Sequence, residues 1–187
     1  MRTTWRWPRD HDEGDLIVSE MDEVIPALVA AVQEQHATGD HYRDDAIRQA
    51  MEHQAQLALR PGPVRVDVIV DPPWSDGQIN SVQVVTGDRP FLVDTVASCL
   101  LRHGWRVEDV RHPIIGVKRD RGTIEAVGMP GRGGCASESW IHIDATAPLG
   151  TDIGQAAEQL RDDLCACLDQ VVCATDDWGA MHEAMLR

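Results

Sequence analysis

The fold is decided by the stretch Thr86-Gly87-Asp88-Arg89-Pro90-Phe91-Leu92-Val93-Asp94-Thr95. The residues before it, Ile79 to Thr86, have the pattern of a strand, and the residues after it have helical spacing of apolar side chains. The apolar side chains that we expect to face inward are Leu92, Val93, Val96 and Leu100. The stretch therefore predicts a strand that turns into a helix from about Pro90 to His103, with Gly104 as a left-handed C-terminal cap.

The turn itself has two interpretations. Asp88 is a candidate N-cap and Pro90 suits the first turn of a helix, so the free backbone N–H groups there could hold a carboxylate or a phosphate. The candidate ligand-binding residues are then Gly87, Asp88, Arg89, Pro90 and Phe91. The other interpretation is a purely structural capped turn, with Phe91 and Leu92 packed into the core.

Other elements follow outward from this turn. Towards the N-terminus, helical spacing predicts one helix around Ile25–Val32, interrupted at 36–40, and a second around Ile47–Ala58. Strict alternation predicts a strand over Val64–Val70, followed by turn residues at 71–77. Towards the C-terminus we expect a strand over 105–118, with Pro113 at an edge or a bulge, a strand over 138–144 and an amphipathic helix over 153–171.

This order predicts an α+β fold. Two helices would return over a four-stranded antiparallel sheet, as in ferredoxin-like domains, and a helical pair would precede it. The strand at 64–70 would stand in for the final strand that such folds add after their second helix. The expected organisation is a loose leader (1–15), a helical extension (16–60) and an α+β domain (61–187).

Composition narrows the partners. Acidic residues outnumber basic ones 31 to 17, which gives a formal net charge of −14. A surface of this charge repels nucleic acid and anionic membranes, so a cationic surface or the rest of a larger polypeptide is the better partner. No apolar run approaches the length of a bilayer span, and the start is not a signal peptide. The five cysteines, an odd number, indicate reduced thiols in a cytoplasmic protein.

Motifs for catalysis or metal binding are weak. The Gly-rich segment 128–136 lacks the ending of a P-loop and is followed by a strand, which favours a flexible hairpin connection. Cys165 and Cys167 are two apart on a helix and cannot chelate one ion together, and Cys167 fits the apolar face of the helix. No arrangement of Ser, His and Asp, or of Cys and His, can be argued, so we expect neither catalytic residues nor a metal site.

A polar stripe lies on the strand at 138–144. Glu138, Trp140 and His142 would point away from the side that carries Ile141 and Ile143. We expect this stripe to be either an interface with a partner or a solvated strand face.

The opening stretch resembles both ACT domains in general and one particular enzyme family that contains them. A strand followed by Asp-Arg-Pro and an apolar helix resembles ACT domains, which bind amino acids and regulate metabolic enzymes. The longer string Val84–Val96 is similar to the N-terminal region of large bacterial NAD-specific glutamate dehydrogenases. The similarity continues in order through three further groups of residues: His112-Pro113-Ile114-Ile115, Glu138 to Ile143, and Asp169-Gln170-Val171-Val172 with Asp176-Asp177-Trp178.

The resemblance implies a non-catalytic, ACT-like regulatory or oligomerisation domain. The parent enzyme converts L-glutamate and NAD to 2-oxoglutarate and ammonium, but its catalytic lysine, aspartate and nucleotide-binding fold belong to a later part of a very long chain. NAD is therefore implied for the parent enzyme and no cofactor for this chain. The expected partners are the remainder of the same polypeptide or further copies of the chain, with an amino acid as a possible effector. A free-standing amino-acid sensor is the alternative.

The turn departs from the family pattern. Arg89 stands where the family has methionine, and Gly87 where it has an acidic residue. ACT domains that hold amino acids commonly have glycine after the proline, and here that residue is Phe91. Its side chain would crowd or plug a ligand site, which favours the structural role.

Overall fold

A computed structural model describes residues 21–35, 44–75 and 77–176. The leader expected at 1–15 and the helix break at 36–40 lie outside these ranges. None of the helices within the described ranges has the length and apolarity needed to cross a bilayer. The elements in chain order are α1 (Met21–Gln35), α2 (Asp44–Ala58), β1 (Val64–Ile69), β2 (Asn80–Gly87), α3 (Leu92–Arg102), β3 (Arg106–Arg111), β4 (Ile114–Asp120), β5 (Thr123–Gly128), β6 (Ala136–Thr146) and α4 (Ile153–Thr175).

The sheet is antiparallel and is organised around β6. The strand order is β1-β2-β6-β4-β5, and β3 also pairs with β6. β2 pairs with most of the length of β6, while β4 and β3 follow one another along its other edge. The α+β class with an antiparallel sheet is therefore confirmed.

The predicted strand at 105–118 is two strands. β3 ends at Arg111 and β4 begins at Ile114, and the Pro113 carbonyl between them accepts the Trp140 N–H at 3.0 Å. Proline has no N–H to give to a ladder, which explains the break at this position. Pro113 was expected to mark an edge or a bulge within one strand, but it divides the strand into two.

β5 was not predicted either, and together with the division at Pro113 it gives the described sheet six strands in place of four. β5 pairs with β4 and forms the outer edge beyond it. The glycine-rich connection at 129–135 is therefore not a hairpin, because the two strands it joins, β5 and β6, lie on opposite sides of β4. Its turns are closed by backbone hydrogen bonds such as Cys135 N–H to the Arg132 carbonyl, at 2.9 Å.

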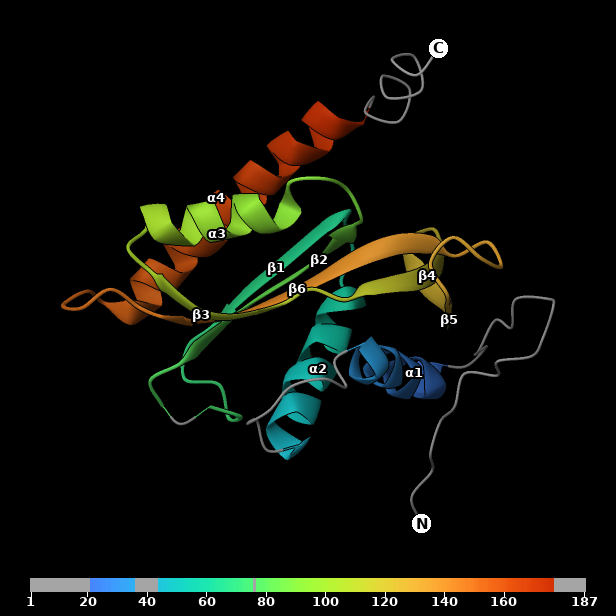
Figure 1. The fold of residues 1–187 in the computed structure, drawn as a ribbon, viewed down its shortest axis with the longest axis horizontal. Helices are drawn as coiled ribbons and strands as arrows, with labels where there is room; N and C mark the ends of the chain where they lie inside the picture. The colour runs from blue at the N-terminus through green and yellow to red at the C-terminus, as the bar shows by residue number, and fades with distance from the viewer. Residues whose placement is uncertain (1–20, 36–43, 76, 177–187) are drawn as a thin grey trace.

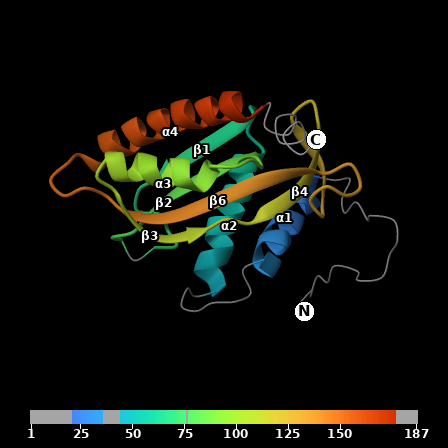
Figure 2. The ribbon, with the colours of Figure 1, turned by 45° about the horizontal axis from the view of Figure 1, so that its top comes forward.

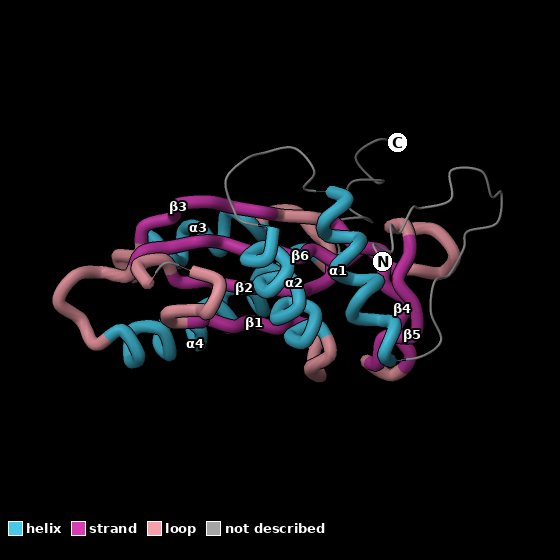
Figure 3. Tube along the Cα trace, turned by 90° about the horizontal axis from the view of Figure 1, so that it is seen from below, coloured by secondary structure: helices cyan, strands magenta, loops and turns pink. Residues whose placement is uncertain are grey.

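Helices cover both faces of the sheet. Figure 1 shows α3 and α4 on one side and α1 and α2 on the other, and Figure 2 gives the same three layers after a 45° turn. Seen from below, α1 and α2 lie across the strands (Figure 3). Each face has its own cluster of buried side chains, and alternate residues of one strand enter different clusters: Ile141 and Ile143 lie against α3 and α4, and Trp140 lies against α1 and α2.

Helix α3 shows how the local sequence produces this arrangement. Leu92, Val96, Cys99 and Leu100 are its buried residues, at the spacing of one helical face. Gly104 has φ +74°, and the N–H groups of Gly104 and Trp105 donate to the carbonyls of Leu101 and Leu100, both at 3.0 Å. This pair of bonds is a Schellman motif, so the predicted glycine cap is confirmed.

Candidate functional site at the turn between β2 and α3

The turn brings together residues that are far apart in the sequence. Asp88 follows β2, Ser139 lies in β6, and His112 lies between β3 and β4. The Ser139 hydroxyl donates to Asp88 Oδ1 at 2.6 Å and lies 3.0 Å from His112 Nε2. The Asp88 N–H donates to the Ser137 carbonyl at 2.9 Å, which fixes the backbone of the turn to β6.

The protons in this cluster exclude a nucleophilic serine. A hydroxyl has one hydrogen, and that of Ser139 is donated to Asp88. His112 Nε2 must then carry a hydrogen and donate to Ser139, so it cannot take the serine's proton as a general base does. Burial lowers the pKa of His112, and the Asp88 carboxylate opposes this shift. The three side chains form a structural hydrogen-bonded group that holds the turn against β6.

Arg89 connects the turn to the C-terminal end of α4. Its Nη1 donates to the Val172 carbonyl (3.1 Å), Thr175 Oγ1 (3.2 Å) and Asp176 Oδ1 (3.1 Å). The last carbonyls of a helix have no partner within the helix and carry partial negative charge, so a guanidinium stabilises that end. Two of the groups that showed the family resemblance, at 86–95 and 169–176, therefore meet at Arg89, while Asp177 and Trp178 lie outside the described residues.

The start of α3 differs from its prediction. The helix begins at Leu92, so Pro90 precedes it, and Phe91 occupies the N-cap position with no side-chain capping bond. Asp88 is not the N-cap, because its carboxylate accepts from Ser139 instead. Gly87, the last residue of β2, has room for a Cβ, with the nearest atom 3.7 Å away on Arg89.

Phe91 is not a core residue. It is 56% exposed, and its backbone is left-handed with φ +72°. Positive φ is the region that glycine enters without strain, and a bulky residue there is unusual. The turn thus keeps a backbone that suits glycine while its side chain points outward. Leu92, expected in the core, is buried at 2%.

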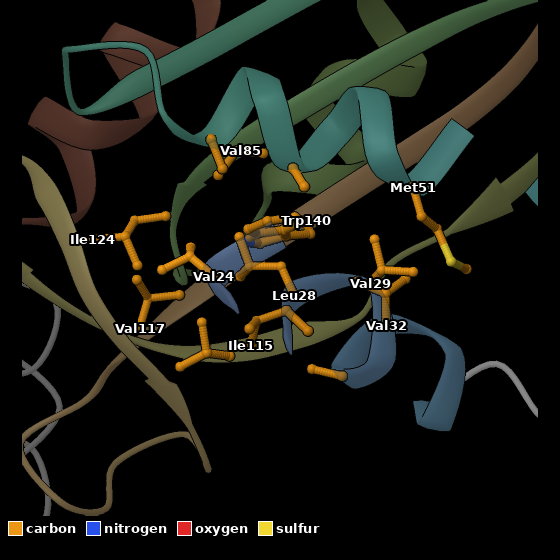
Figure 4. Close-up of a cluster of buried hydrophobic side chains, with 14 of the residues drawn as sticks. Val24, Leu28, Val29, Val32, Met51, Val85, Ile115, Val117, Ile124 and Trp140 are labelled. Carbon is orange, nitrogen blue, oxygen red and sulfur yellow. The ribbon is translucent and has the colours of Figure 1, made fainter. Parts of the chain in front are cut away.

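The polar stripe on β6 faces the helical pair of the same chain. Glu138, Trp140 and His142 are exposed by 7%, 0% and 5%. Trp140 lies at the centre of the α1/α2 cluster, near Val24 and Leu28 (Figure 4). The expected alternation is present, but the face opposite Ile141 and Ile143 is covered and not solvated, because α1 and α2 form a second layer of the fold.

A buried polar network beneath α2 was missed by the sequence analysis. Gln83 donates to the Ala50 carbonyl at 2.9 Å, its Oε1 lies 2.8 Å from His53 Nδ1, and Gln54 donates to the Ile141 carbonyl at 2.9 Å. The signal for it was present in polar residues at alternate positions, Ser81 and Gln83 in β2 and His142 and Asp144 in β6. These contacts anchor α2 to the sheet.

The network also contains a serine, a histidine and an aspartate, but not in a catalytic order. His142 Nε2 lies 3.0 Å from Asp144 Oδ1 and 3.5 Å from Ser81 Oγ. A relay needs the histidine to contact serine through one ring nitrogen and aspartate through the other. Here Nδ1 lies 3.2 Å from Gln83 Nε2, so the group has a structural role.

The space beneath the helices is small. A cavity of about 10 Å³ lies next to Gln54, Arg111 and His142, enough for about one water molecule and too small for an amino acid. Among the described residues, no group of three His, Cys, Asp or Glu side chains is placed to hold a metal ion.

Comparison with known proteins adds one finding. A family model described as the glutamate dehydrogenase ACT1 domain matches residues 27–164. The matched range includes residues 27–35 of α1, all of α2, strands β1 to β6, the turn at 87–91 and the first half of α4. A comparison with curated proteins gives no match.

Proposed function

Because the chain belongs to the glutamate dehydrogenase ACT1 domain family, we propose that it is a non-catalytic regulatory domain of a large NAD-dependent glutamate dehydrogenase. The family match over residues 27–164 is the observation that carries this proposal. In this proposal, the parent enzyme converts L-glutamate and NAD to 2-oxoglutarate and ammonium. The domain acts through contacts with the remainder of the polypeptide or with further copies of itself.

The turn supports a role in shape and communication. An amino-acid ligand would need a cation for its carboxylate and an acceptor for its ammonium group. Arg89 is already bonded to the end of α4, and Asp88 to Ser139. The turn is therefore hydrogen-bonded to both β6 and α4, and in the proposed role a change at one of them is passed to the others.

The alternative, an amino-acid sensor, is favoured by two specific atoms. Thr86 Oγ1 and Arg89 Nε are buried without a hydrogen-bond partner. Buried polar atoms are usually paired, and both of these belong to the segment that forms the turn. An effector that reached them would supply the missing acceptors.

Two measurements test these functions. Titration calorimetry of the purified chain against a panel of amino acids is expected to give no heat of specific binding, whereas tight binding of one amino acid would favour the sensor. The chain mixed with glutamate and NAD is expected to form no NADH. Turnover by the chain alone would contradict a non-catalytic domain.

The reading frame supplies an independent test of the parent enzyme. We expect the frame that encodes this chain to include a nucleotide-binding fold with a catalytic lysine and aspartate. A frame without these would contradict the proposed parent and leave the sensor.

A further inference from the structure

Two thiols and a guanidinium meet where α3 packs on α4. Cys99 lies on the buried face of α3, and Cys167 lies on α4 at the edge of the same apolar cluster. Arg102, one turn after Cys99, donates through Nη2 to Cys167 Sγ at 3.1 Å. The Cys99 thiol also interacts with both Arg102 and Cys167. All three side chains therefore form one cluster between the helices.

The two thiols differ in their surroundings. Cys99 is fully buried, and this burial raises the pKa of its thiol, while the neighbouring Arg102 opposes the rise. Cys167 is partly exposed, so a small reagent can reach it. A guanidinium that donates to a sulfur stabilises the negative charge with which that sulfur attacks an electrophile. Cys167 is thus the attacking thiol, and Cys99 is the neighbour that can react with its product.

We propose that Cys167 and Cys99 are a peroxide-sensitive dithiol that oxidises to a disulfide between α4 and α3. The Cys167 sulfur attacks one oxygen of a hydroperoxide, the O–O bond breaks, and Cys167 becomes a sulfenic acid. The other oxygen takes the Cys167 thiol proton and leaves as water or an alcohol. The Cys99 sulfur then attacks the Cys167 sulfur and the S–O bond breaks. The hydroxyl group of the sulfenic acid leaves as water with the Cys99 proton. Two thiols lose two electrons in total, and one hydroperoxide gains them.

The other three thiols lie in less favourable places. Burial raises the pKa of Cys165, and the nearby Asp169 and Asp162 raise it further. Burial likewise raises the pKa of Cys135. Cys173 is the exposed thiol of α4 and is the natural comparison, because it would react first if exposure alone decided the rate.

The disulfide would act on the turn. α3 begins at Leu92, directly after Phe91, and Arg89 holds the end of α4. A covalent bond between α3 and α4 would fix the two helices that enclose this turn, and reduction would release them.

The first test uses the wild-type chain. The reduced chain is treated with hydrogen peroxide at about one equivalent, alkylated with N-ethylmaleimide, digested and analysed by mass spectrometry. We expect a peptide pair joined through Cys99 and Cys167, which dithiothreitol separates. Oxidation at Cys173 with Cys99 and Cys167 still alkylated would overturn the proposal.

Variants separate the roles. In Cys99→Ser, oxidation should stop at a Cys167 sulfenic acid that dimedone traps, and Cys173→Ser should leave the cross-link unchanged. Arg102→Gln should slow the reaction of Cys167 by roughly three- to tenfold, the effect of losing one charge-assisted hydrogen bond at a partly exposed site, and Arg102→Lys should restore part of the rate. Circular dichroism confirms that each variant is folded. An unchanged rate in folded Arg102→Gln would overturn the role of the guanidinium.

Discussion

At the scale of single residues, Phe91 shows how a turn can keep its backbone and change its side chain. Its φ of +72° carries strain that glycine would not, and the residue is 56% exposed. Phe91→Gly should therefore change the free energy of unfolding by no more than about 1 kcal/mol in either direction, since relief of strain offsets the added freedom of the unfolded chain. Urea denaturation measures this.

The buried neighbour is the matched control. Leu92→Ala should cost about 2–5 kcal/mol, because Leu92 is 2% exposed. Phe91→Ala should be less stable than Phe91→Gly, because alanine keeps the left-handed strain. A loss as large as that of Leu92→Ala in the Phe91→Gly variant would show that the aromatic ring is packed after all.

His112 gives a pH dependence with a definite sign. Its folded pKa lies below the unfolded value of about 6.5, chiefly because of burial. As the pH falls below about 6.5 the unfolded chain takes up this proton first, so stability decreases until the folded pKa is reached. His112→Gln should flatten the dependence of unfolding free energy on pH between about 7 and 5. Equal slopes in the two proteins would contradict this.

The sequence predicted which residues form the turn but not how they bond. Asp88 has the right type and place for an N-cap, yet Ser139 lies more than fifty residues away and its hydroxyl takes the carboxylate. Local patterns cannot include a partner that only the sheet register brings near. The structural interpretation placed both Phe91 and Leu92 in the core, but only Leu92 is buried.

At the scale of elements, we expect Arg89 to stabilise the last turn of α4. Arg89→Gln removes the charge that stabilises the last carbonyls of the helix. Hydrogen exchange should become faster in the last turn of α4, with a loss of about 1 kcal/mol in unfolding free energy. Arg161→Gln, an exposed arginine on the same helix, is the control and should leave exchange there unchanged. Equal exchange in both variants would mean that α4 does not depend on the turn.

Glu138 and Arg119 hold α2 against the sheet. Arg119 donates to both Glu138 oxygens, at 2.6 and 3.0 Å, and to the Ala58 carbonyl at the end of α2, at 3.0 Å. The side chains of this pair are only 9% and 15% exposed. Glu138→Ala should therefore cost about 3 kcal/mol, because it leaves a nearly buried guanidinium without its carboxylate.

The neighbouring pair Lys118–Glu125 is the control, because both of its side chains are more than 40% exposed. Glu125→Ala should change stability by no more than about 0.5 kcal/mol, as for other exposed pairs. Thermal or urea unfolding separates the two. Similar losses of stability in both variants would show that the buried Arg119–Glu138 pair contributes no more than the exposed Lys118–Glu125 pair.

The elements were predicted best where one apolar face repeats over several turns. α2, α3 and α4 lie where helical spacing indicated, and Gly104 ends α3 as expected. β5 was missed because Thr123–Gly128 is short and joins a sheet edge, where only some of its side chains are buried. Pro113 was noticed, but a proline alone does not reveal whether a strand bends or divides.

At the scale of the whole molecule, the helical pair is a layer and not an addition. The boundary expected at residue 60 stays a prediction, yet α1 and α2 bury Val85, Ile115, Val117 and Trp140. A fragment of residues 61–187 should expose this face and the polar network beside it. We expect it to aggregate or to bind the dye ANS, whereas the full chain should not. A monomeric fragment with cooperative unfolding would show that the pair is dispensable.

The fold class followed from the order of elements, but the number of layers did not. A strand that is buried on both faces is usually recognised by apolar residues at consecutive positions. β6 is buried on both faces, yet it has polar residues at 138, 142 and 144. Those residues are buried with polar partners, since Glu138 pairs with Arg119 and His142 pairs with Asp144. Because these buried residues are polar, the sequence pattern did not predict that helices cover this face of β6.

The central place of β6 has a consequence for synthesis on the ribosome. β2, β3 and β4 all pair with β6, the last strand of the described sheet to be made. Before residue 146 emerges, only the β1–β2 and β4–β5 hairpins can form, and neither can bury its apolar faces on the complete sheet. The nascent chain must therefore wait with exposed valines and isoleucines, which makes this interval the one in which chaperones are most needed.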